Sequence, residues 1–122
     1  MPQKNDPALL FDMLQAANAV VGFVHGRSDA DFQRELMLRS AVERQIEIIG
    51  EAARFVSETF RSAHPEIPWR QIVAQRHILA HDYGVLIPAR LWRVATVHVP
   101  ELIGHLTPLV STPIDDNDGT RT

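Results

Sequence analysis

The sequence predicts an all-α fold, an antiparallel up-and-down bundle of four helices, and three observations predict it. Apolar residues recur at intervals of three and four in each of four segments, the spacing of one helix face. Proline or an N-capping side chain stands where each segment begins. The 122 residues can bury a core of their own, and without cysteine the chain needs no disulfide and has no thiolate metal site.

The first predicted helix begins with Asp6 as its N-cap and Pro7 at the first helical position, and it ends before Gly26. We expect no membrane contact, because no apolar run approaches the length of a membrane span and the N-terminus lacks the form of a signal peptide. A soluble, cytoplasmic protein is therefore expected. The expected core stripe of this helix is Leu10, Leu14, Ala17, Val21 and Val24.

The second predicted helix is long. Ser28 and Asp31 resemble a capping box, and no glycine or proline follows before Gly50, so we expect one helix from there to about Ser62. A bend is expected at residues 32–36, where the apolar stripe is irregular. Gly50 costs about 1 kcal/mol relative to alanine in mid-helix, which indicates close approach of another helix, the one that carries Arg76. The core stripe is Val42, Ile46, Ile49, Ala53, Val56 and Phe60.

Two further helices follow a rigid connector at residues 64–68. Pro68 is placed as the first residue of the third helix, and Pro88 opens the fourth. Pro100 removes the hydrogen bond to the Thr96 carbonyl and predicts a kink there. Residues 1–110 form one domain and residues 111–122 a flexible acidic tail. The expected core is Trp69, Ile72, Val73 and Leu79 in the third helix, and Trp92, Ala95, Val99, Leu102, Leu106 and Leu109 in the fourth.

Residues 76–83 gather a guanidinium, two imidazoles, a carboxylate and the only phenol of the chain. Arg76 supplies a charged fork that suits phosphate oxygens, and His81 can move protons near neutral pH. On a helical wheel Arg76 and Tyr83 almost align, whereas His81 lies about 140° from Arg76. The three side chains therefore converge only if the helix ends near His81, as Gly84 favours, or if a second element or subunit completes the site. Caps and packing contacts are the alternative use of these residues.

The spacing Arg76-x4-His81-x-Tyr83 resembles the signature of the HepT-like toxins of the HEPN superfamily. Four further segments fit that family in order: residues 41–44 (AVER), 49–52 (IGEA), 65–70 (PEIPWR) and, after Trp92, 99–102 (VPEL). The resemblance runs from about Asp6 to Leu109. It departs from the family at His77, where asparagine is usual.

The resemblance implies a HEPN-type helical bundle that acts as a metal-independent endoribonuclease toxin of a type VII-like toxin–antitoxin pair. It implies a homodimer, an RNA substrate, a cognate minimal nucleotidyltransferase antitoxin, and AMP transfer from that partner to Tyr83. Arg76 and His81 would be catalytic and no cofactor is implied. His77 and Asp82 would support them.

Two alternatives stay open for the other polar residues. Glu43, Glu47 and Glu51 form a stripe that is solvated or pairs locally with Arg44 and Arg54, whereas Arg44 and Glu51 also match the family and would orient the site. His77 and His81 have metal-ligand spacing, but Asp82 lies elsewhere on the wheel, so we expect no metal. His98 and His105 are interpreted as solvent-facing or hydrogen-bonded polar residues.

The net charge of −3 argues against a general nucleic-acid coat, although the segment from Arg61 to Arg93 is locally basic, with five arginines against Glu66 and Asp82. Two other functions compete with the ribonuclease. One is a non-catalytic HEPN module that binds a nucleotidyltransferase and presents substrate to it. The other is a helical scaffold with no site.

Overall fold

The structure is a computed structural model that describes the backbone of residues 4–81 and 88–110, and the side chains of residues 4–75 and 88–110. Within these ranges every regular element is helical, which confirms the all-α class. The predicted tail at 111–122 lies outside the described residues. The elements are α1 (Asp6–Val24), α2 (Asp29–Arg34), α3 (Leu36–Phe55), α4 (Glu58–Ala63), α5 (Trp69–His81), α6 (Pro88–Arg93), the π-helix η1 (Val94–His98) and α7 (Val99–Val110).

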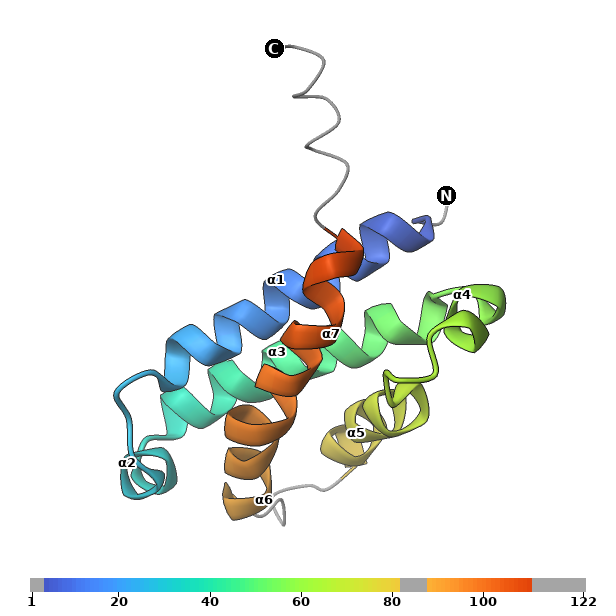
Figure 1. Cartoon of the computed structure of the whole chain (residues 1–122). Helices are drawn as coiled ribbons and strands as arrows, with labels where there is room; N and C mark the ends of the chain where they lie inside the picture. The colour runs from blue at the N-terminus through green and yellow to red at the C-terminus, as the bar shows by residue number, and fades with distance from the viewer. Residues whose placement is uncertain (1–3, 82–87, 111–122) are drawn as a thin grey trace, which may run out of the picture.

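The two long helices α1 and α3 lie side by side and form the centre of the molecule (Figure 1). α7 crosses them and packs against α1, while α5 packs against the other flank of α3. One hydrophobic core joins these helices. The predicted α3 stripe is confirmed from Val42 to Val56, with Phe60 half-buried. The side chains that are almost fully enclosed are Met13, Val20, Phe32, Val42, Val56, Ile67, Leu91 and Leu106.

The N-terminus of α1 is capped one residue earlier than the sequence predicts. The Asn5 side chain accepts a hydrogen bond from the Ala8 amide at 3.0 Å, so Asn5 is the N-cap and the assignment of Asp6 was wrong. The Asp6 carboxylate instead accepts hydrogen bonds from the amide and hydroxyl of Ser57, at 2.9 and 2.7 Å. Asp6 therefore ties the start of α1 to the start of α4, a contact across 51 positions of the chain that local capping rules do not contain.

The buried face of α1 is rotated from the predicted stripe. Leu10 and Ala17 are buried as expected, but Val21 is 36% exposed. Leu9, Met13, Ala16 and Val20 are buried in its place. The periodicity was ambiguous because α1 carries apolar residues around most of its circumference, including Phe11, which is 48% exposed.

The same composition corrects the expectation that no run approaches a membrane span. α1 has 19 residues and a mean hydropathy of 1.5, so by length and composition it could cross a membrane. The core helix of a soluble protein passes the same test, and six α1 residues are buried here against neighbouring helices. Packing against α3 and α7 accounts for the apolar face that they form.

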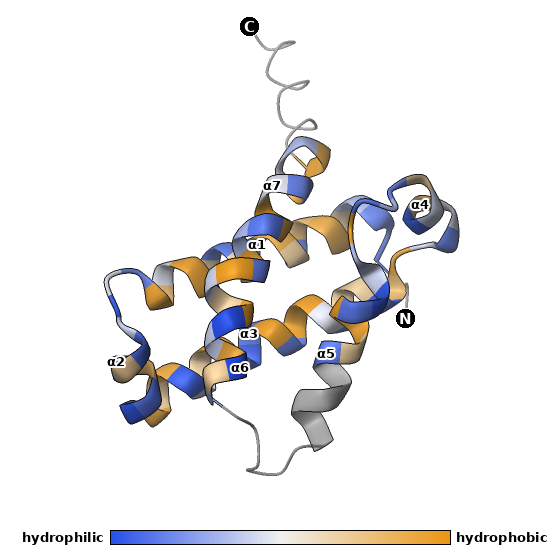
Figure 2. Cartoon of the chain, turned by 60° about the horizontal axis from the view of Figure 1, so that its bottom comes forward, coloured by the Kyte–Doolittle hydropathy of each residue, from blue (hydrophilic) through white to orange (hydrophobic). Residues whose placement is uncertain are grey.

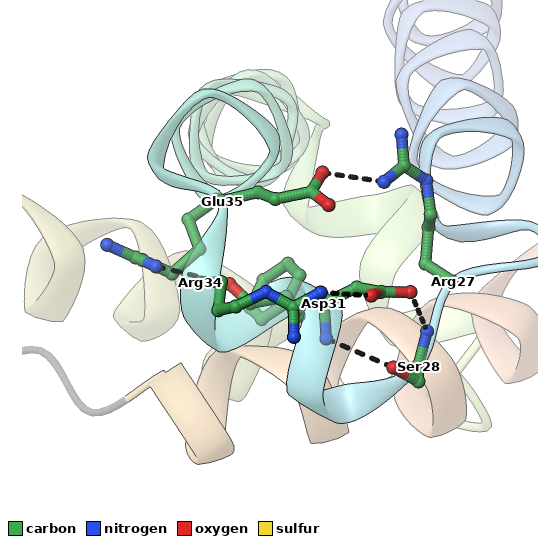
Figure 3. A network of polar contacts seen from close by, with 7 residues as sticks. Arg27, Ser28, Asp31, Arg34 and Glu35 are labelled. Atoms are coloured by element: carbon green, nitrogen blue, oxygen red, sulfur yellow. Dashed lines mark hydrogen bonds and ion pairs between the residues drawn. The ribbon is translucent and has the colours of Figure 1, made fainter.

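The predicted long second helix is divided into three, and the first break is at Glu35. The capping box is confirmed, because the Ser28 hydroxyl accepts from the Asp31 amide and the Asp31 carboxylate accepts from the Ser28 amide, both at 3.0 Å (Figure 3). Glu35 is extended (φ −100°, ψ 97°) and pairs with Arg27 at 2.6 Å. The Arg39 guanidinium donates to the carbonyls of Phe32 and Gln33, which have no partner within α2 once the helix stops.

The bend expected at residues 32–36 is thus a complete break. It lets α2 turn so that Phe32 enters the core, where its ring lies 5.2 Å from that of Trp92. The burial of a whole phenylalanine offsets the lost helical hydrogen bonds.

The second break is at Val56 and Ser57, both extended. The Ser57 hydroxyl accepts from the Phe60 amide at 3.1 Å and caps α4. Because Asp6 also binds Ser57, two side chains fix a break that the sequence shows neither by glycine nor by proline.

The predicted fourth helix is also divided, into α6, η1 and α7. The π-helical segment ends immediately before α7, where the Val99 amide donates to the Val94 carbonyl five residues back. Pro100 is the second residue of α7 and has no amide to give to Thr96, so the wider turn stands where the kink was predicted. The predicted core residues Ala95, Val99, Leu102 and Leu106 are buried, and Leu91 joins them.

Candidate functional site

The residues of the Arg-x4-His motif lie in the last turns of α5. The backbone of Arg76, His77 and His81 is helical, and α5 ends at His81. The side chains of these three residues, and all of Asp82 and Tyr83, lie outside the described residues. Positions 76 and 81 of a regular helix are 140° apart about its axis, so their side chains leave one helix in different directions. The catalytic assignment of this set stays a prediction.

The start of α5 is held firmly by the connector that precedes it. Trp69 donates its indole N–H to the His64 carbonyl at 2.9 Å and packs edge-on against Phe60. Ile67 is 1% exposed, and the Pro68 carbonyl accepts the first hydrogen bond of the helix. Pro68 therefore stands just before α5, one position from its predicted place. These contacts fix the direction in which α5 carries the motif.

α5 packs against α3, as expected for the helix that bears Arg76. Gly50 of α3 is buried. Ile72 and Val73 are half-buried rather than enclosed, so α5 contributes less to the core than predicted.

A cleft of about 510 Å³ opens between α3, α5 and the chain from α6 to α7. Figure 2 shows α5 and α6 on either side, with α3 between them. Its apolar lining comes from α3, α5, η1 and α7: Ile46, Ile49, Ile72, Val94, Val99 and Leu102. Its polar lining among the described residues is Glu66, Gln71, Gln75, Arg90, Arg93, His98, Glu101 and His105. The cleft thus combines an apolar floor with a polar rim, a common form of ligand site.

The charged groups of the rim differ in their pairing. The Glu66 carboxylate lies 3.0 Å from His64 Nδ1, and Glu101 lies 3.6 Å from His98 Nδ1. A hydrogen bond from its own backbone amide, and then the one from His64, hold the pKa of Glu66 below its usual value. Arg90 and Arg93 are exposed and, among residues 4–75 and 88–110, neither has an ion-pair or hydrogen-bond partner. Positive charge therefore remains available on the α6 side.

Sequence reasoning did not single out this cleft. His98 was interpreted as solvent-facing or satisfied; it is exposed and paired with Glu101, and it also lines the cleft. His105 is half-buried and lines it too. The one signal was the locally basic segment from Arg61 to Arg93, which contains both rim arginines.

Arg44 and Glu51 lie elsewhere, on the surface formed by α1 and α3. They line a separate hollow of about 430 Å³ that also includes Lys4 and Asp12 of α1. The expected local pairs are present, since Arg44 lies 3.5 Å from Glu47 and Arg54 lies 3.8 Å from Glu51. Neither Arg44 nor Glu51 lines the cleft beside α5, and a role for them in orienting the motif stays a prediction.

Glu43 differs from the other carboxylates of its stripe because it is half-buried. Burial, followed by repulsion from Glu47, raises the pKa of the Glu43 carboxyl, and Arg39 partly offsets this. Its folded-state pKa therefore exceeds its unfolded value, so the contribution of this group to stability falls as pH rises through that range.

Within the described part of the chain, no three His, Asp or Glu side chains come together as a metal site. The His77 and His81 pair lies outside this statement, because neither side chain is described.

Comparison with known proteins identifies the family whose features these helices share. The sequence model of the family described as "Ribonuclease HepT-like" matches residues 13–108. This stretch includes α3, α5 and the cleft. No solved structure matches the chain.

Named relatives cover most of the chain. A protein of Methanocaldococcus jannaschii named "Putative RNase" is 36% identical over 102 residues, which are 84% of this chain and 94% of the relative. One from Thermococcus cleftensis named "Probable ribonuclease HepT" is 34% identical over 95 residues, 78% of this chain and 86% of its own. A third, from Caldanaerobacter subterraneus and named "Putative RNase", is 33% identical over 90 residues, 74% of this chain and 80% of its own.

Proposed function

Because the chain belongs to the HepT-like ribonuclease family, we propose that it is a metal-independent endoribonuclease whose catalytic groups are Arg76 and His81. The observation that carries the proposal is the family match over residues 13–108, which includes the last turns of α5 where both residues lie. The relatives named as ribonucleases support the same reaction class.

The proposed reaction is transesterification within RNA. A ribose 2′-hydroxyl attacks the adjacent phosphorus, the bond to the 5′-oxygen of the next nucleotide breaks, and a 2′,3′-cyclic phosphate forms. His81 transfers the proton that leaves the 2′-hydroxyl or reaches the 5′-oxygen. Arg76 stabilises the negative charge of the pentacoordinate phosphorus. His77 and Asp82 support these groups, and Arg44 and Glu51 support the fold around α3.

The test is the cleavage of RNA by the purified chain in excess EDTA. We expect cleavage to persist, with products that end in a 2′,3′-cyclic phosphate and a 5′-hydroxyl. An RNA with a single 2′-deoxyribose at the cleavage position should resist. Cleavage of the deoxy substrate at the same bond would exclude this mechanism, and no cleavage of any RNA would favour a non-catalytic module that presents substrate to a nucleotidyltransferase.

We also propose that two copies of the chain form the working enzyme in the cytoplasm. Arg76 and His81 are 140° apart on α5, so a second copy related by a two-fold axis could complete each site. Light scattering at the concentration of the cleavage assay should give the mass of a dimer. A monomer with full activity would contradict this.

The regulatory part of the proposal concerns a toxin–antitoxin pair. The protein would be the toxin, and its partner a minimal nucleotidyltransferase that silences it by transferring AMP to Tyr83. A phenol close to the catalytic groups is a chemically suitable acceptor, since the added phosphodiester would compete with RNA phosphate for Arg76.

A further inference from the structure

We propose that the cleft between α3, α5 and the α6–α7 chain holds one nucleotide of the RNA strand beside the bond that is cut. The base would lie on the apolar floor, and the neighbouring phosphate would bind Arg90 and Arg93. This inference rests on the proposed function and adds a substrate-binding subsite to it.

The position of the cleft supports a subsite next to the motif. Gln75 lines the cleft, and Arg76 follows it directly in α5. His81 is six residues further, about 9 Å along the helix axis at 1.5 Å per residue. The opposite wall begins at Pro88, only five residues after Tyr83. Both walls of the cleft thus lead directly to the motif.

The lining of the cleft suits a nucleobase. Ile46, Ile72 and Leu102 contribute apolar surface, and Gln71 and Gln75 add amides from α5. Single-stranded RNA is usually recognised through splayed bases, which present an apolar face for packing and polar edges for hydrogen bonds. A floor of aliphatic side chains bordered by amides provides for both.

The charge distribution places the phosphate on the α6 side. Arg90 and Arg93 are one helical turn apart, and both are exposed and without partners among the described residues. A guanidinium forms paired hydrogen bonds with phosphate oxygens. The acids Glu66 and Glu101 belong to other elements and already lie beside His64 and His98.

Because no described contact in the fold uses either arginine, the variant Arg90→Ala/Arg93→Ala should fold normally. The probe is a fluorescent 2′-O-methyl RNA oligonucleotide, which lacks the attacking hydroxyl and cannot be cut. We expect its Kd to rise about tenfold in the variant. The slope of log K against log salt should become shallower by about 1.4, from about 0.7 for each lost phosphate contact on a single strand.

The matched control is Arg34→Ala/Arg70→Ala, which removes the same charge. Both control arginines are exposed and neither lines the cleft. An equal loss of affinity in the control and in the cleft variant would mean that only net charge matters, and would overturn the subsite.

A second measurement places the base on the wild-type protein. An oligonucleotide with one 4-thiouridine should crosslink, under ultraviolet light, to peptides that contain Ile46, residues 71–75 or residues 98–105. Crosslinks confined to α1 would overturn the inference even if the arginine variant binds weakly.

The outcomes separate this inference from the proposed function. Cleavage by the wild type together with unchanged binding in Arg90→Ala/Arg93→Ala would overturn the subsite alone. Binding that depends on these arginines, without any RNA cleavage, would support the subsite and refute the nuclease. Absence of oligonucleotide binding by the wild type would overturn the subsite.

Discussion

Replacing His81 or Arg76 with alanine is expected to reduce kcat for RNA cleavage by about a thousandfold, with the melting temperature nearly unchanged. General acid–base catalysis by a positioned side chain is worth about 10²- to 10⁴-fold. Loss of one group that stabilises transition-state charge costs about 10²- to 10³-fold. Both residues lie at the end of α5, beyond the turns that Trp69 and its contacts anchor, so the fold should tolerate their removal.

The measurement is single-turnover cleavage of one defined RNA, with helical circular dichroism and thermal melts for each variant. His25→Ala and Arg34→Ala are controls of the same residue types on exposed positions of the other end of the molecule. If both motif variants unfold, the residues are structural and the catalytic assignment fails. If EDTA abolishes cleavage and zinc or magnesium restores it, His77 and His81 are metal ligands instead.

The second large effect concerns Tyr83, whose replacement by phenylalanine should make the enzyme resistant to its partner. The phenol is the only one in the chain, so Tyr83→Phe removes the proposed acceptor of AMP and nothing else. Incubation with the nucleotidyltransferase and ATP should add AMP masses to the wild type and none to the variant. Cleavage should fall by at least a hundredfold in the modified wild type, because each AMP adds a negative charge and a bulky nucleoside beside the catalytic groups.

The control is Tyr83→Phe assayed without the partner, which reports how far the phenol itself assists cleavage. Intact mass spectrometry after incubation decides the acceptor. A gain of AMP on Tyr83→Phe equal to that on the wild type would place the acceptor elsewhere, and this account of control would be wrong.

The sequence by itself determined the helical class, most of the core of α3 and α7, the capping box of α2 and the family. These depend on local spacing and on segments whose order is readable along the chain. A 3.6-residue period indicates a helix face wherever one side of the helix is polar, as in α3. It failed for α1, where apolar residues surround the helix and only packing against α3 and α7 selects the buried face.

Only the tertiary structure decided where the second helix breaks and where the cleft lies. Glu35 and Ser57 end helices because Arg39 and Asp6, distant in sequence, satisfy the backbone groups that each break exposes. The cleft brings Gln75 and Arg90 onto facing walls, and no local pattern relates the two positions. Local rules describe how a residue treats its own turn of helix, whereas long-range hydrogen bonds and packing decide which of several acceptable local structures the chain adopts.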